Sequence, residues 1–171
     1  MAGLRKGYAM INTIRSTLFA CAALLAAGVL PAAAGNVILT IDGDVAGGAP
    51  IDMTLEDIEA LGAATVITKT PWHEAAVTFE GVPLAALLEK AGATGTSLSV
   101  LALNNYRSEM PVSDLAEHGV ILAYKQDGAY MPVSDKGPLF IVYPFDADPA
   151  LNDEVYYARS AWQVRSITVE D

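Results

Sequence analysis

The chain has 171 residues, of which 53% are hydrophobic and 18% charged, and this length indicates a single folded domain. Twenty acidic residues against ten basic ones give a formal net charge of −10. This surplus of negative charge disfavours nucleic acid or an anionic membrane face as a partner, and it favours basic or cationic partners.

The first 34 residues have the composition of a secretory signal peptide. Arg5, Lys6 and Arg15 supply a basic region, residues 17–30 are apolar, and the small residues 32–34 precede the expected cleavage point. The apolar run is short for a membrane span. We therefore expect a periplasmic or secreted protein with no membrane contact after cleavage, starting at Met1 or at Met10.

Residues 35–171 are then expected to form the single mature domain. Cys21 is the only cysteine of the chain, so this domain has no disulfide, no thiolate metal ligand and no cysteine nucleophile. It keeps seven basic and all twenty acidic residues, a formal net charge of −13.

Apolar alternation and β-branched runs predict the strands of this domain. In chain order they cover residues 36–45, 64–69, 77–79, 97–103, 120–124, 139–143 and 163–169. The run 139–143 is apolar without interruption, which is typical of a central strand covered on both faces. Lys136 precedes this run, and Asp146 follows where the chain leaves the sheet.

Three short helices are predicted between these strands. Thr54 and Asp57 have the spacing of a capping box for a helix over residues 55–61. Residues 84–91 form a helix that Gly92 ends, and Ser113 caps a helix that Gly119 ends.

The segments between these elements have the composition of loops and turns. Asn104-Asn105-Tyr106-Arg107 and residues 146–153 are predicted loops, Asp127-Gly128 a hairpin turn, and residues 155–162 an irregular or helical segment. Strands outnumber the helices, which indicates an α+β fold with a mixed β-sheet or a compact barrel.

The common signatures of catalysis and metal binding are missing from the sequence. His73 and His118 lack the spacing of metal ligands, and Ser113 stands in no Gly-x-Ser-x-Gly motif. No glycine-rich loop ends in the Lys-Ser/Thr of a phosphate-binding loop. We assign no catalytic residue and no metal ligand.

Polar side chains at strand exits are the more specific pattern. They are Asn104, Asn105, Tyr106, Arg107, Lys136, Tyr143, Asp146 and Arg159. Arginine suits phosphate or carboxylate, and asparagine suits the edge of a heterocycle. One hypothesis places these groups around a shared pocket, and the other treats them as surface charges with no common target.

The order of three motifs resembles the oxidoreductase molybdopterin-binding domain, the fold of sulfite oxidase-type enzymes. Phe79-Glu-Gly-Val-Pro-Leu84 resembles the family's helix entry. Lys136-Gly-Pro and the following apolar strand resemble its later core strand, and residues 157–169 resemble its closing segment. The resemblance covers the chain from about Val37 to Val169. In a cleft of this kind, the candidate roles are contact with heterocycle edges for Asn104 and Asn105, anion binding for Arg107, Lys136 and Arg159, and ring stacking for Tyr106 or Trp162.

The sequence departs from this family at the metal ligand. Catalytic members bind molybdenum through a cysteine thiolate before the helix entry, where this chain has Ile67-Thr68-Lys69-Thr70. We therefore expect a non-catalytic domain without molybdenum. Its cleft would take a molybdopterin-type cofactor, another small anionic or heterocyclic ligand, or a periplasmic protein partner.

Two alternatives remain open. One is a periplasmic molybdopterin-dependent oxidoreductase whose cofactor is held non-covalently or completed by a partner subunit. The other is an accessory or sensory module that docks a basic partner.

Overall fold

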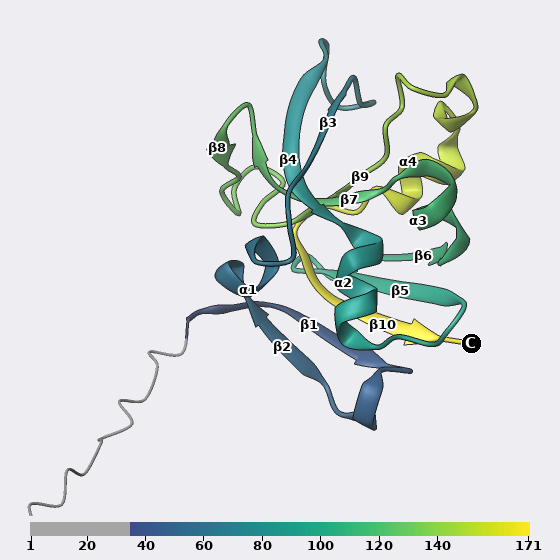
Figure 1. Ribbon diagram of the computed structural model, residues 1–171. Coiled ribbons are helices and arrows are strands. Elements are labelled where there is room, and N and C mark those ends of the chain that lie inside the picture. Colours follow the sequence, from purple (N-terminus) through teal and green to yellow (C-terminus); the bar gives the residue numbers. More distant parts are fainter. Residues whose placement is uncertain (1–34) are drawn as a thin grey trace, which may run out of the picture. The chain divides into compact units, whose positions relative to one another are not determined.

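The computed structural model describes residues 35–171, and the predicted signal peptide lies outside these described residues. Within this described part of the chain, ten strands form two sheets, with four α-helices and two 3-10 helices between them (Figure 1). This confirms the predicted α+β class. Neither sheet closes on itself within residues 35–171, so the compact barrel was the wrong alternative.

The first sheet is mixed. Its strand order is β2 (Ile51–Thr54), β1 (Val37–Gly43), β10 (Val164–Glu170), β5 (Ser97–Ala102) and β6 (Arg107–Pro111). The strands β1 and β10 run parallel, and the other neighbours are antiparallel. The closing strand of the chain therefore lies in the middle of the sheet.

The second sheet is antiparallel. It runs β3 (Ala64–Thr68), β4 (Val77–Pro83), β7 (Ile121–Gln126) and β8 (Ala129–Tyr130), and β9 (Phe140–Val142) also pairs with β7. The strands β4 and β7 approach so closely that a Cβ added at Gly81 would lie 2.3 Å from the carbonyl oxygen of Leu122. This contact explains the glycine of the helix-entry motif.

The apolar run around β9 is buried on both faces, as predicted. Ile141 and Tyr143 belong to one hydrophobic cluster, and Phe140 and Val142 belong to the other. On the side away from β7, the Ile141 N–H donates to the carbonyl of Ala161 at 2.9 Å. The run therefore separates the two hydrophobic clusters. It has a neighbouring strand, β7, on one edge only, and the irregular segment around Ala161 lies along its other edge.

The helices are α1 (Leu55–Glu59), α2 (Leu84–Ala91), α3 (Ser113–His118) and α4 (Glu154–Arg159), and the 3-10 helices are η1 (Ala46–Gly48) and η2 (Pro149–Leu151). Thr54 and Asp57 form the predicted capping box of α1. Gly92 and Gly119 end α2 and α3 with left-handed backbones, as predicted. The prediction for Ser113 was wrong, because it lies inside α3 and caps nothing.

Two strands were not predicted. Ile51–Thr54 follows a glycine-rich loop and pairs with β1, and Arg107–Pro111 pairs with β5. In the second strand Ser108 and Met110 point inward while Arg107 and Glu109 point outward. The strand was missed because its inward side chains include the polar Ser108, so the sequence shows no clear alternation of apolar and polar residues. Pairing with β5 is what makes this segment a strand. In the described part of the chain, no helix is long and apolar enough to cross a membrane.

Candidate functional site

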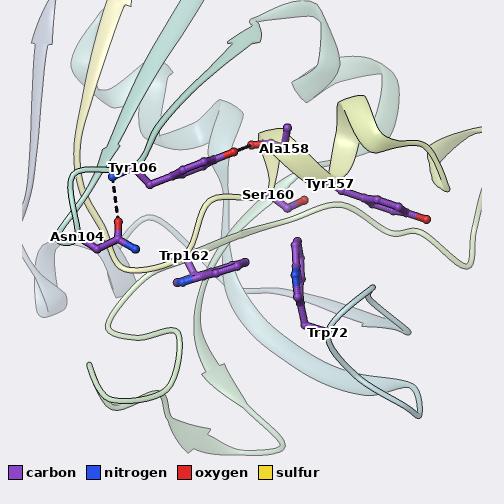
Figure 2. Close-up of a pocket in the computed structure, with 7 residues that line it drawn as sticks. All are labelled: Trp72, Asn104, Tyr106, Tyr157, Ala158, Ser160 and Trp162. Atoms are coloured by element: carbon purple, nitrogen blue, oxygen red, sulfur yellow. Dashed lines mark hydrogen bonds between the residues drawn. The ribbon is translucent and has the colours of Figure 1, made fainter.

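A pocket of about 340 Å³ opens beside the hydrophobic cluster that contains Phe140 and Val142 (Figure 2). Four distant segments supply its walls: the loop between β3 and β4, the turn between β5 and β6, the end of α4, and the segment before β10. Its lining residues are Trp72, Asn104, Tyr106, Tyr157, Ala158, Ser160 and Trp162. Four of these seven are aromatic, and none carries a charge.

The turn between β5 and β6 fixes one corner of this aromatic pocket. The side-chain oxygen of Asn104 accepts the backbone N–H of Tyr106 at 2.9 Å. Asn105 between them has a left-handed backbone with φ of 66°, which asparagine tolerates better than most residues. The Tyr106 hydroxyl then donates to the carbonyl of Ala158 at 2.9 Å, which ties the turn to α4.

Two tryptophans form the opposite corner. The rings of Trp72 and Trp162 meet edge to face, with centroids 4.8 Å apart and planes at 78°. Both rings also contact Phe140 of β9 edge to face. Because Phe140 is fully buried, it anchors both indoles on the core and leaves their outer surfaces to the pocket.

A second hollow of about 430 Å³ adjoins the aromatic pocket, since Tyr106 and Ala158 line both. Arg107 and Arg159 line this second hollow, and Glu109, on the same face of β6 as Arg107, lines it too. It is therefore the arginine-lined side of the site, whereas the aromatic pocket is uncharged.

Arg159 is held by a buried carboxylate. Its Nη1 donates to Oδ2 of Asp114 at 2.8 Å, and the hydroxyl of Tyr143 donates to the same oxygen at 2.6 Å. Asp114 and Tyr143 are buried. Burial, followed by the hydrogen bond to Asp114, raises the pKa of Tyr143 well above its usual range. Arg159 thus joins α4 to α3 in addition to lining the second hollow.

Asp146 closes the end of β3. Its carboxylate accepts the backbone N–H of Lys69 at 2.7 Å, and its own N–H donates to Oγ1 of Thr68 at 3.0 Å. Thr68 has no exposed surface. The family resemblance implies a thiolate at this strand end. Here Asp146 instead closes the strand end with two hydrogen bonds, one to Lys69 and one to Thr68.

Lys136 lines neither hollow. Its Nζ contacts Oδ1 of Asp135 at 3.2 Å, and its backbone is left-handed with φ of 59°. Its charge acts on His73, whose Nδ1 lies 2.6 Å from Oγ1 of Thr70. Partial burial, and then the charge of Lys136, lower the pKa of His73.

The structure thus brings together five of the nine predicted site residues. Asn104, Tyr106 and Trp162 line the aromatic pocket, and Arg107 and Arg159 line the second hollow. Asn105, Lys136, Tyr143 and Asp146 line neither of these two cavities.

Sequence reasoning missed Trp72, Tyr157 and Ser160 as pocket residues, and Asp114 as the partner of Arg159. Both tryptophans of the chain contribute to the pocket, so tryptophan content was a usable signal for Trp72. For Ser160 and Asp114 we find no sequence signal, because their positions depend on contacts between distant segments.

The sequence matches one family of protein domains over most of its length. The model of the oxidoreductase molybdopterin binding domain matches residues 27–147. The chain belongs to this family. The matched range includes Trp72, Asn104, Tyr106 and Arg107, whereas Arg159 and Trp162 follow it in the sequence.

Among solved structures, the fold is similar to that of the sulfane dehydrogenase SoxCD from Paracoccus pantotrophus. The TM-score is 0.57 at 19% sequence identity, which shows a shared fold. The match covers 78% of this chain and 38% of the SoxCD chain, so this protein spans well under half of that relative. No curated protein matches the sequence.

The residues present do not fit the metal of the family's cofactor. The sequence from residue 35 onward contains no cysteine, and Thr68 and Thr70 offer hydroxyls that bind a soft metal weakly. Thr68 is also committed to Asp146. Within residues 35–171, no three His, Cys, Asp or Glu side chains gather into a possible metal site.

Proposed function

We propose that this protein is an exported, non-catalytic member of the molybdopterin-binding domain family that binds a small organic ligand in the aromatic pocket. The observation that carries the proposal is the contrast between two parts of one site. The strand end at Thr68 offers no thiolate and is closed by Asp146, whereas a pocket with aromatic walls is kept open.

The pocket has the features of a small-molecule site. It is concave and mostly apolar, and a few polar groups at its rim can orient a ligand. The second hollow adds Arg107, an exposed guanidinium in a domain with a net charge of −13. An anionic group of the ligand would be held there, with Arg159 beside it.

The first experiment is to purify the protein from its native host and measure its metal and ligand content. We expect no stoichiometric molybdenum, and a small organic molecule that mass spectrometry detects after release. Stoichiometric molybdenum would overturn the non-catalytic assignment.

A second experiment locates the ligand. Arg107→Gln removes one charge from the second hollow, whereas Arg165→Gln removes an exposed charge from β10 that lines a separate cavity and neither of these two. A ligand with an anionic group should be lost from the first variant during purification and retained by the second. Equal retention by both variants would place its anionic group elsewhere.

Family membership also favours a second candidate, a periplasmic oxidoreductase whose cofactor is bound without the cysteine ligand. Reduction of a sulfoxide or a similar oxo-substrate by the purified protein would support it, provided that Arg107→Ala and Lys136→Ala abolish the reaction.

The charge of the domain supports a third candidate, a module that docks a basic periplasmic protein. Co-purification of one basic partner that is released by salt and unaffected by Arg107→Gln would favour this function.

A further inference from the structure

The aromatic pocket presents ring faces from several directions. The perpendicular indoles of Trp72 and Trp162 make a corner. Figure 2 shows the Tyr106 ring on the opposite side of the pocket from Trp162, with Tyr157 on a third side. Such an arrangement surrounds a rounded group, because at least two of its walls stand at a large angle to each other.

The faces of these rings carry partial negative charge, which attracts cations. The hydroxyl hydrogen of Tyr106 is directed to the carbonyl of Ala158, and that of Ser160 to the carbonyl of Tyr156 at 3.0 Å. Their oxygens therefore keep only lone pairs for a ligand. The ring faces and these two oxygens are partly negative, although no carboxylate lines the pocket and the Asn104 amide adds an N–H donor.

The partial negative charge of the ring faces favours an organic cation over an anionic ring as the ligand. A negatively charged heterocycle would meet ring faces of the same sign, in a domain with a net charge of −13. A trimethylammonium group has no hydrogen-bond donor or acceptor to satisfy, and its charge is spread over methyl groups that pack against ring faces.

We propose that the aromatic pocket binds a quaternary ammonium group, as found in choline- or carnitine-type metabolites. The inference rests on the proposed function, because it takes this pocket as the ligand site. It replaces the small anionic or heterocyclic ligand expected from the sequence with an organic cation. The Arg107 side of the site then receives any carboxylate that the same ligand carries.

Tryptophan fluorescence measures this binding locally, since both tryptophans of the chain line the pocket. Choline and carnitine are titrated into the purified protein, together with the uncharged carbon isostere of choline, in which a tert-butyl group replaces trimethylammonium. We expect saturable changes with choline and carnitine, and about tenfold weaker binding of the isostere. Equal binding of choline and its isostere would overturn the proposal, because shape alone would then explain it.

Two matched variants separate the pocket from the rest of the surface. Tyr106→Leu keeps apolar bulk but removes one ring face from the pocket, and Tyr130→Leu makes the same change on the similarly exposed hairpin β7–β8. Choline binding should weaken about fivefold or more in the first variant and stay unchanged in the second. Folding of each variant is checked by its unfolding transition.

A pterin carboxylate serves as the competing probe. Binding of this flat anion in a Tyr106-dependent manner, without binding of choline or carnitine, would overturn the cation proposal and leave the ligand-binding function standing. If no probe binds and the natively purified protein releases no ligand, the proposed function fails as well.

Discussion

Arg159 of α4 donates to the buried carboxylate of Asp114 in α3 across 2.8 Å, and this contact connects the wall of the binding site to the core. The Tyr143 hydroxyl shares the same carboxylate oxygen. Removal of one partner from such a pair leaves the other charge without compensation in a poorly solvated place. This network should therefore control the stability of α4 and of the pocket residues that follow it.

Asp114→Asn is expected to lower the free energy of unfolding by about 2–3 kcal/mol, because Arg159 loses its charged partner while it stays mostly buried. Urea unfolding measures the change. Glu117→Gln on the same helix is the control. Its carboxylate is exposed and lies 3.9 Å from His118, so its loss should change stability by less than about 1 kcal/mol. Equal effects of the two substitutions would contradict a special role for Asp114.

Tyr143→Phe should cost about 1–2 kcal/mol near neutral pH through the lost hydrogen bond to Asp114. Above the ordinary tyrosine pKa of 10.0, Tyr143 ionises in the unfolded chain but not in the folded one, because its folded pKa is raised. Rising pH therefore removes stability from the wild type and not from the variant at this position.

The measurement is the difference in free energy of unfolding between wild type and Tyr143→Phe at successive alkaline pH values. Tyr124 and Tyr130, whose pKa values are also raised, remain in both proteins, so the difference isolates Tyr143. It should shrink as the pH passes 10.0. A constant difference would mean that Tyr143 ionises equally in both states.

His73 should make the protein less stable as the pH falls below 6.5. Its folded pKa lies below this usual value, so the unfolded chain takes up the proton first and gains stability relative to the folded state. Well above pH 6.5 both states are neutral at this residue, and its contribution is constant.

Lys136→Gln tests the stated cause of this shift. Removal of the positive charge near His73 should move its pKa upward, toward 6.5, which an NMR titration of the imidazole would detect. Lys90→Gln on α2 removes an exposed charge elsewhere and should leave the titration of His73 unchanged. If the pKa of His73 does not move in Lys136→Gln, burial alone explains why it is lowered.

Thr54→Ala should lower the free energy of unfolding by about 1 kcal/mol, since its side chain caps α1 and receives the backbone N–H of Asp57 at 3.2 Å. Ser113→Ala is the matched case in which the sequence suggests a cap but the structure has no capping hydrogen bond. Thermal or urea unfolding of Ser113→Ala should differ from the wild type by less than about 0.5 kcal/mol. A larger loss there would mean that Ser113 does cap α3.

The local features of the fold could be predicted from the sequence. The capping box at Thr54, the left-handed glycines at 92 and 119, and the Asp127-Gly128 hairpin each depend on residues a few positions apart. The apolar run around β9 was also predicted, because burial on both faces requires apolar residues at every position. The family resemblance rested on the same motifs, including Gly81, whose close contact with β7 explains why glycine stands there.

The binding site was decided by tertiary structure. The sequence showed that polar residues end several strands, but it did not show which of them meet. Folding places Trp72 against Trp162 and Tyr106 against Ala158, directs Asp146 to the end of β3, and gives Arg159 a buried partner in Asp114. These contacts join segments far apart in the chain, and their geometry follows from how the two sheets and α4 pack, which no local spacing of residues records.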